Sequence, residues 1–381
     1  MSTLSPVLAA MQTYPFVRLD EAKAEARARG IQLIDFGMGD PLEPTPAFIQ
    51  RALAEALPLT EGYPRAQGLP ELRSAIAGWV RRRFGAEVDP ETELIPTYGS
   101  KEAIFLFPLV AVDRERGKDV VVVPEPAYPV YERGAAFAGA ETRFLPLHEN
   151  AAWLPDLDAI DDETWRRCAI FWVNYPHNPT GAVAPLTFYA ELAERAREHG
   201  FYLASDEAYT ELWFDAPPES AVQLPDRGNV VVFNTLSKRS SMTGYRSGFV
   251  CAEPALISAL RSFRPNVGTA PQEFVQRASV PAWNDEQHVE DTRARYARKR
   301  AVIESALPPL ARGSSAATFY LWFVVPGAEK AEAFATRLLE HGIVVAPGSY
   351  FGPSGEGYAR LALVPSLEEC ERAAAILRET L

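Results

Sequence analysis

Four short clusters of polar residues each follow a predicted strand in the middle of the chain. They are YGSKE at 98–102, YPHNPTG at 175–181, SDEAY at 205–209 and TLSKR at 235–239. In an open parallel sheet, ligands bind where the carboxyl ends of the strands meet the loops that follow. We therefore expect all four clusters to face one site, which would combine a lysine amine, a carboxylate and donors for an anion.

A lysine and a carboxylate placed in this way suit a pyridoxal 5'-phosphate (PLP) cofactor, which needs an amine for its aldehyde and an anion against its ring nitrogen. Lys238 lies beyond a strongly apolar strand, where desolvation and the nearby cation of Arg246 would favour the neutral, nucleophilic amine. Asp206 would keep the pyridine nitrogen protonated. We predict Lys238 as the Schiff-base lysine, with Asp206 and Tyr209 as further catalytic residues.

The other groups that such a cofactor needs also have candidates. Asn178 and Tyr209 can hydrogen-bond its ring oxygen, and Tyr128 offers a ring to stack on. Gly99 and Ser100 open a helix whose free backbone N–H groups can bind the phosphate. Further predicted phosphate donors are Lys101, Thr235, Ser237 and Arg246.

Simpler roles are open for several of these residues. Asp206 could cap the following helix, and Asn178 could stabilise the turn before Pro179. Lys101 could contact the phosphate, contact the substrate, or only begin a helix. Tyr128 could serve loop packing.

The elements that must position the clusters alternate between short apolar runs and longer helical stretches. Strands are predicted at 93–96, 120–123, 169–173, 201–204, 230–234 and 248–251, and helices at 101–112 and 188–199. This rhythm predicts an α/β fold with a mainly parallel sheet covered by helices on both faces.

The last third of the chain changes character after the loop at 264–268. A helix is predicted at 285–307 and strands at 319–324, 343–345 and 358–363, which indicate a second, smaller α/β unit. An amino-terminal helix at 19–29 and strand at 33–36 should join it. We predict a large PLP-binding domain of residues 46–273 and a small domain of residues 1–45 and 274–381, with a cleft between them.

Composition excludes several classes of partner. The chain has 381 residues, 47% of them hydrophobic, and a net charge of -12, which would repel nucleic acid or an anionic membrane. No apolar run approaches the length of a membrane span, and the three cysteines and five histidines show no metal-site spacing. We expect a cytoplasmic protein without a metal.

Several motifs occur in an order that is typical of one family. They are NPTG at 178–181, DEAY at 206–209, SK at 237–238 and GYRSG at 244–248, joined by FGMGDP at 36–41, YPRAQGLPELR at 63–73 and YARLAL at 358–363. Over nearly its whole length the chain thus resembles the class I/II aminotransferases, which have PLP fold type I. The departures are modest, with Tyr245 where the family often has Trp and Thr235 where serine is common.

The resemblance implies an enzyme that moves amino groups between amino acids and 2-oxo acids, with glutamate and 2-oxoglutarate as a pair. It implies that Arg360 and Asn178 bind the substrate, Arg360 through its α-carboxylate, and that Gly39 leaves the substrate room. It also implies a homodimer in which Tyr63 reaches the phosphate in the neighbouring subunit. From the residues alone, Arg360 could be a surface arginine and Tyr63 a loop-packing residue.

The amino-acid sequence of four longer stretches is similar to that of bacterial succinyldiaminopimelate aminotransferases. These stretches are residues 14–23, 95–109, 174–183 and 236–249. That resemblance implies N-succinyl-LL-2,6-diaminopimelate as the amino donor and a role in lysine biosynthesis. Aspartate, alanine and LL-diaminopimelate aminotransferase activities stay open, as does a PLP-dependent C-S lyase. A DNA-binding regulator is disfavoured by the chain length, and a nucleotide-binding enzyme by the absence of a complete GxGxxG or GxxxxGK[ST] string.

Overall fold

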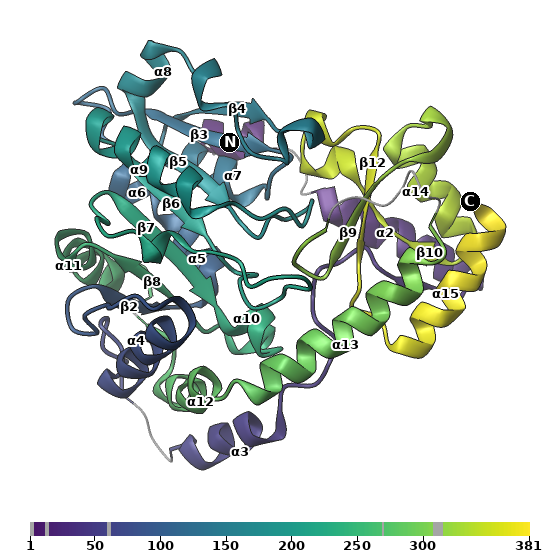
Figure 1. The fold of residues 1–381 in the computed structure, drawn as a ribbon, viewed down its shortest axis with the longest axis horizontal. Helices are drawn as coiled ribbons and strands as arrows, with labels where there is room; N and C mark the ends of the chain where they lie inside the picture. The colour runs from purple at the N-terminus through teal and green to yellow at the C-terminus, as the bar shows by residue number, and fades with distance from the viewer. Residues whose placement is uncertain (1–3, 12–14, 59–61, 269, 308–314) are drawn as a thin grey trace.

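The computed structural model describes residues 4–11, 15–58, 62–268, 270–307 and 315–381. Tyr14, the first residue of one stretch that carries the resemblance, lies outside the described residues. Figure 1 shows two α/β units side by side, a larger one from the middle of the chain and a smaller one from its carboxyl-terminal part. No described helix is long and apolar enough to cross a membrane.

The larger unit is built on a seven-stranded sheet, which confirms the predicted α/β class. Its strands are β2 (Leu94–Thr97), β3 (Val120–Glu125), β4 (Glu141–Pro146), β5 (Cys168–Asn174), β6 (Tyr202–Asp206), β7 (Val230–Thr235) and β8 (Gly248–Ala252). Their spatial order is β2-β8-β7-β6-β5-β3-β4, and β8 runs in the direction opposite to the other six strands. β3, β5 and β7 are buried along their full length because helices cover both faces of the sheet.

The sequence pattern missed strand β4. It lies at the edge of the sheet, and all of its residues are exposed or half-buried. Glu141 and Arg143 pair with each other at 2.9 Å there, so the strand has charges where the periodicity of a buried strand requires apolar residues. Charged side chains are a common protection of edge strands.

The helices that accompany this sheet follow the predicted alternation. They are α3 (Ala47–Ala56), α4 (Pro70–Phe84), α5 (Gly99–Leu106), α6 (Pro108–Ala111), α7 (Val130–Phe137), α8 (Asp162–Arg167), α9 (Leu186–His199), α10 (Leu236–Arg239), α11 (Pro254–Phe263) and α12 (Glu273–Asn284). The helix predicted at 101–112 is divided in two at Phe107. Pro108 opens the second part, since proline has no N–H to continue the first.

The smaller unit combines both ends of the chain. Its three-stranded antiparallel sheet has the order β11 (Ala346–Pro347), β12 (Tyr358–Ala362), β9 (Tyr320–Val324), and β1 (Ile34–Asp35) pairs in parallel with β10 (Ile343–Val344). The remaining helices are α1 (Pro6–Ala10), α2 (Pro15–Ala28), α13 (Gln287–Glu304), α14 (Ala331–Glu340) and α15 (Leu367–Thr380). Pairing of β1 with β10 joins the amino-terminal segment to this unit, while the domain boundaries at 45/46 and 273/274 stay a prediction.

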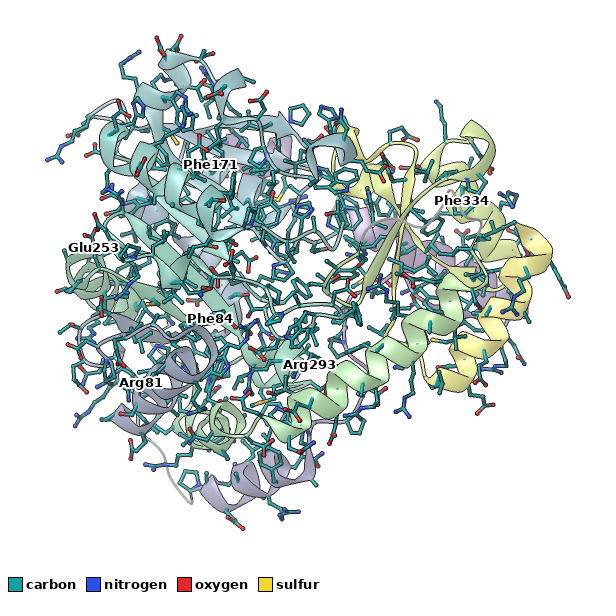
Figure 2. All side chains as sticks on the ribbon, viewed as in Figure 1. Arg81, Phe84, Phe171, Glu253, Arg293 and Phe334 are labelled. Carbon is teal, nitrogen blue, oxygen red and sulfur yellow. The ribbon has the colours of Figure 1, made fainter. Side chains whose placement is uncertain are left out.

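The buried hydrophobic residues form three clusters, and one of them, which includes Trp79 and Phe351, extends from the larger unit into the smaller one. Figure 2 shows Phe171 within the larger unit and Phe334 within the smaller one, and both side chains are fully buried. Tyr209 follows β6 of the large sheet but packs into the core of the smaller unit, edge-on against Phe319 at 5.7 Å. The loop after β6 therefore connects the large sheet to the smaller unit, and α13 runs from beside α12 across to that unit in Figure 1.

Candidate active site

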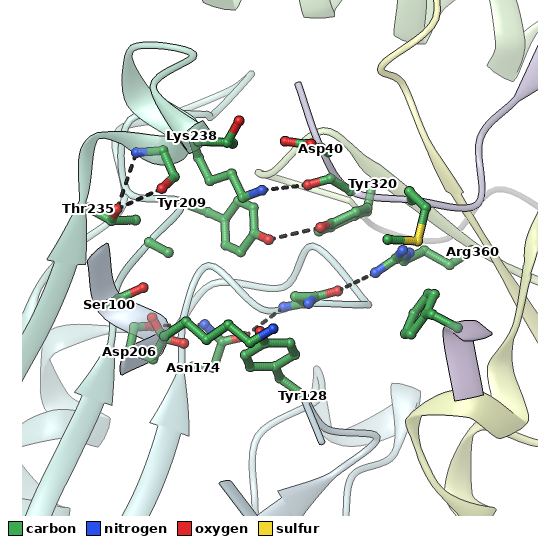
Figure 3. A pocket seen from close by; sticks show the side chains of 18 of the residues that line it. Asp40, Ser100, Tyr128, Asn174, Asp206, Tyr209, Thr235, Lys238, Tyr320 and Arg360 are labelled. Carbon is green, nitrogen blue, oxygen red and sulfur yellow. Dashed lines mark hydrogen bonds between the residues drawn. The ribbon is translucent and has the colours of Figure 1, made fainter. Parts of the chain in front are cut away.

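A cavity of about 320 Å³ opens where the carboxyl ends of β5, β6 and β7 meet the smaller unit. Figure 3 shows it with side chains from both units around it. Twelve of the predicted residues line this cavity: Gly39, Ser100, Lys101, Tyr128, Asn178, Asp206, Tyr209, Thr235, Ser237, Lys238, Arg246 and Arg360. All four sequence clusters contribute to it, as expected from the ends of the strands.

Lys238 extends from the short helix α10, directly after β7. Its amine donates to the backbone carbonyl of Gly39, and it lies 5.6 Å from the ring centroid of Phe319. Burial lowers the pKa of Lys238 to about 8, an effect that Asp40 opposes and Arg360 reinforces. An amine with this pKa is in part neutral near pH 8 and can attack an aldehyde.

Asp206 ends β6 and is 5% exposed. Its Oδ2 accepts a hydrogen bond from the Tyr131 hydroxyl at 2.7 Å, whereas its Oδ1 has no hydrogen-bond partner among the described residues. Burial raises the pKa of Asp206 to about 6, and the Tyr131 hydroxyl opposes that rise. A buried carboxylate oxygen at the edge of a cavity, with no partner in the described part of the chain, is suited to a cationic or N–H group of a ligand.

Donors for a phosphate gather at one end of the cavity. Thr235 caps α10, where its hydroxyl accepts the N–H of Ser237 at 3.2 Å. Arg246 has a positive φ of 56° and donates to the carbonyls of Thr243 and Tyr98, and so its guanidinium is held in place before any anion binds.

Gly99 does not line the cavity; it makes the approach of Arg246 possible. A Cβ at position 99 would lie 2.7 Å from Nη2 of Arg246, and the φ of Gly99 is +73°, so a side chain would be strained on both counts. Gly99 was predicted to bind the phosphate, but it is not among the residues that line the cavity. It leaves space for the guanidinium of Arg246, which does line the cavity.

Arg360 of the smaller unit and Asn178 of the larger unit form a buried hydrogen-bonded pair. Arg360 is 3% exposed; it donates to Oδ1 of Asn178 at 2.9 Å and to the carbonyl of Gly37 at 2.8 Å. Its guanidinium lies over the rings of Tyr320 and Phe351, 4.2 and 4.7 Å from their centroids. Because Oδ1 of Asn178 accepts from Arg360, the amide nitrogen of Asn178 is left to donate elsewhere.

Tyr209 and Tyr320 join the two units across the cavity. Their hydroxyls are hydrogen-bonded at 2.8 Å, as the dashed line in Figure 3 shows. A Cβ at Gly39 would lie 2.0 Å from the Tyr320 hydroxyl. Gly39 is therefore required by the close approach of Tyr320, which is a reason additional to the room for substrate that the family resemblance implies.

Several lining residues were not expected from the sequence. They are Phe16, Met38, Asp40, Asn174, Ala208, Thr243, Tyr320 and Phe351. Asn174 could have been found, since it directly follows the strand predicted at 169–173; its amide donates to the carbonyl of Asp206 at 2.8 Å. Tyr320 and Phe351 follow no motif, because they are brought in by the smaller unit.

Tyr63 and Lys101 differ in their relation to the cavity. Tyr63 is 97% exposed and does not line the cavity of its own chain. Lys101 does line it, with its amine 6.0 Å from the ring centroid of Tyr128, and burial together with Arg246 lowers its pKa. Both positions are compatible with the predicted roles, but the partner of Tyr63 would have to be a second chain.

The arrangement fits the PLP cofactor that the sequence predicts. The cavity joins a partly neutral lysine, a buried carboxylate oxygen without a partner, an arginine with hydroxyls beside it, and the ring of Tyr128. These match the aldehyde, ring nitrogen, phosphate and ring face of PLP in turn. Within the described residues, no group of three or more His, Cys, Asp or Glu side chains could hold a metal ion.

Comparison with known proteins gives the same assignment independently. The family model described as "Aminotransferase class I and II" matches residues 31–377. The LL-diaminopimelate aminotransferase of Aquifex aeolicus is 40% identical, with 98% of each chain covered.

Solved structures are also similar over nearly the full length. A probable N-succinyldiaminopimelate aminotransferase from Thermus thermophilus has a TM-score of 0.89 and 34% identity, covering 96% of this chain and 100% of that one. The aspartate aminotransferase of the same organism, with maleate, has a TM-score of 0.90 and 30% identity, with 100% of both chains covered.

Proposed function

Because the chain belongs to the class I and II aminotransferase family, a family of PLP-dependent enzymes, we propose that it takes its amino group from a 2,6-diaminopimelate donor and passes it to a 2-oxo acid. The acceptor that we expect is 2-oxoglutarate. The observation that carries the proposal is the buried Arg360 and Asn178 pair, which shares one cavity with Lys238 and Asp206.

PLP, when bound, supplies an electron sink for the pair released as the Cα–H bond of the substrate breaks. The residues around it then have distinct tasks. Arg360 would bind the α-carboxylate through two parallel N–H donors and so fix which face of Cα is presented. The amine of Lys238 would take the proton from Cα of the substrate and deliver it to the C4' carbon of the cofactor, on the other side of the substrate nitrogen.

Asp206 and Tyr209 would act on different atoms of the cofactor ring. The carboxylate of Asp206 would stabilise a proton on the ring nitrogen, and Tyr209 with the Asn178 amide would donate to the ring oxygen. Arg246, Ser237 and Thr235 would anchor the phosphate, so that the reacting end keeps its place when Lys238 is released.

Two forms of the donor are supported by different observations. The curated relatives at 37–40% identity carry the name LL-diaminopimelate aminotransferase, which favours the free diamino acid. The wording of the four stretches in the sequence, and the Thermus thermophilus structure at 34% identity, favour the N-succinyl derivative. Both forms present the same α-amino acid end to Arg360 and differ at the distal amine, so a direct comparison of the two decides between them.

We also propose that the enzyme acts as a homodimer with shared sites. Tyr63 has the exposure expected of a residue that completes a neighbouring subunit's cavity. Other large apolar side chains are exposed on the segments near both ends of α3, among them Leu42 and Leu57. Burial of such side chains is a usual source of stability in a dimer.

The experiment is a half-reaction screen on the purified, PLP-loaded protein. Each donor is added without an acceptor, and the loss of the visible absorbance of the bound cofactor is followed. We expect LL-diaminopimelate or its N-succinyl derivative to react with the highest second-order rate constant, with glutamate as the reverse donor. A panel in which aspartate or alanine reacts at least tenfold faster than both would refute the proposal.

The same experiment tests the C-S lyase alternative. Cystathionine is added without any oxo acid, and pyruvate and ammonia are measured. An aminotransferase gives at most one turnover under these conditions, because no acceptor restores the cofactor. Sustained production of pyruvate would overturn the assignment of the reaction.

A further inference from the structure

Tyr131, which belongs to none of the four clusters, lies directly behind the carboxylate of Asp206. It is on α7 and is 3% exposed. Its hydroxyl donates to Oδ2 of Asp206 at 2.7 Å, and it is separated from Asp206 by 75 residues in the sequence. The two carboxylate oxygens of Asp206 therefore have different environments. Oδ2 is hydrogen-bonded to the protein, whereas Oδ1 remains for a ligand.

The ring of Tyr131 is fixed on two sides. It stacks on Trp172 with centroids 4.9 Å apart and planes at 23°, and Trp172 is itself fully buried on β5. Its edge meets the ring of Tyr128 at 5.8 Å and 84°. Because Tyr128 and Trp172 hold the ring, the hydroxyl is directed at Asp206 and has little freedom to turn elsewhere.

The groups that face Asp206 make this hydroxyl its main stabilising partner. Tyr209 lies three residues after Asp206, and burial raises the pKa of Tyr209 well above its usual value, so that its hydroxyl stays neutral. The neighbouring Glu207 directs its carboxyl the other way, to the hydroxyl of Ser205 and the N–H of Ala221. Among these neighbours Tyr131 has the donor that favours the ionised form of Asp206, with the Ala208 amide as a smaller contribution.

We propose that Tyr131 is a positioning residue, which turns Oδ1 of Asp206 toward the ring nitrogen of the cofactor and keeps that carboxyl ionised. A neutral O–H donor stabilises a carboxylate more than a carboxylic acid. Without it the carboxyl would keep its proton to higher pH and could rotate. The inference rests on the PLP site and not on the identity of the amino donor.

The test is the affinity of the apoprotein for pyridoxamine 5'-phosphate, which binds without a covalent link to Lys238. Tyr131→Phe keeps the stacked ring and removes only the hydroxyl. We expect affinity at pH 7.5 to fall about tenfold, the usual size for a hydrogen bond to a charged group. The pH midpoint of binding should also move upward, because Asp206 must be ionised to hold the ligand.

A matched control is Tyr175→Phe. Tyr175 is 1% exposed and its hydroxyl donates to the carbonyl of Trp153 at 2.6 Å, so the change removes a buried tyrosine hydroxyl of the same kind away from the carboxyl of Asp206. The affinity of this variant for pyridoxamine 5'-phosphate should stay within about twofold of wild type, and its pH midpoint within about 0.2 units. Changes this small are expected because Tyr175→Phe removes no hydrogen bond to a charged group.

A double-mutant cycle separates positioning from packing. In the Asp206→Asn background, Tyr131→Phe should have less than a twofold effect, since no charge remains to be stabilised. An equal loss in both backgrounds, or an unchanged pH midpoint for Tyr131→Phe, would overturn the inference.

If Tyr131→Phe or Asp206→Asn does not fold, incorporation of 3-fluorotyrosine at position 131 gives a further test. Its more acidic hydroxyl is a stronger donor and should move the pH midpoint downward. An upward shift or no shift would overturn the inference. Because no amino donor is present in any of these assays, a wrong substrate assignment could not produce either result.

Discussion

The substitution Asp206→Asn should stabilise the cofactor-free protein against unfolding, although it should abolish the turnover of the PLP-loaded enzyme. The fold holds a carboxylate at a site where its charge is poorly solvated, and burial raises the pKa of Asp206 to about 6 from 3.8. A raised pKa means that the folded state binds the proton more tightly than the unfolded state. Stability from this group is thus present at low pH and is lost as pH rises from about 4 through about 6.

The size of the effect follows from that shift. At 1.36 kcal/mol per unit, a difference of about 2 units amounts to about 3 kcal/mol at pH 7.5. An asparagine would place an N–H at the position of Oδ1, where no described residue accepts it, and this would cost about 1 kcal/mol. We therefore expect the Asp206→Asn apoprotein to be more stable than wild type by about 2 kcal/mol at pH 7.5 and to show no gain at pH 4.

Thermal or denaturant unfolding of both apoproteins across this pH range measures the difference. Asp119→Asn is a control of opposite sign, because its ion pair with Arg167 lowers the pKa of Asp119, so its removal should destabilise at neutral pH. The reasoning is refuted if the Asp206→Asn apoprotein is less stable than wild type at pH 7.5, or if the difference is the same at pH 4.5 and 7.5. In the presence of PLP the same variant should lose turnover.

The other expected outcomes concern three residues of the cavity. Lys238→Ala should lower turnover at least ~1,000-fold while PLP still binds without a covalent link, as dialysis and absorbance would show; full activity would contradict the assignment. In the wild-type apoprotein, the rate of PLP capture should rise about tenfold from pH 7 to pH 9 and then level off, because burial lowers the pKa of Lys238 to about 8; a rise that continued beyond pH 10 would indicate an ordinary lysine. Arg360→Lys should lower kcat/KM for the amino donor about 100-fold through loss of two parallel donors, with little change in PLP affinity. Tyr320→Phe should leave the KM within about twofold, since the ring over Arg360 remains, whereas Tyr320→Leu should raise it about tenfold.

The clusters at the ends of the strands show how far the sequence alone could go. Each of the four follows an apolar strand, and the carboxyl ends of parallel strands lie at one edge of a sheet. The local pattern was therefore enough to bring Ser100, Asn178, Asp206 and Lys238 to one cavity, without knowledge of any contact between them. The α/β class followed from the same alternation, because strand and helix periodicities are local properties.

Features with weak local signals were missed. β4 is a polar edge strand, and its residues do not repeat in the way that buried strands do. The split between α5 and α6 depends on one proline within an apolar run that otherwise reads as a single helix. The surrounding sheet gives β4 its extended conformation despite its polar residues. The split at Pro108, in contrast, has a local cause that the sequence contains.

What only the tertiary structure decided is which side chain meets which. Tyr131 and Asp206 are 75 residues apart, Tyr209 and Tyr320 are 111 apart, and Asn178 and Arg360 are 182 apart. The sequence determined the chemistry that each segment brings, since backbone periodicity and residue type act over a few positions. Contacts between distant segments depend on packing within each unit and between the two units, and no pattern within either segment encodes that packing.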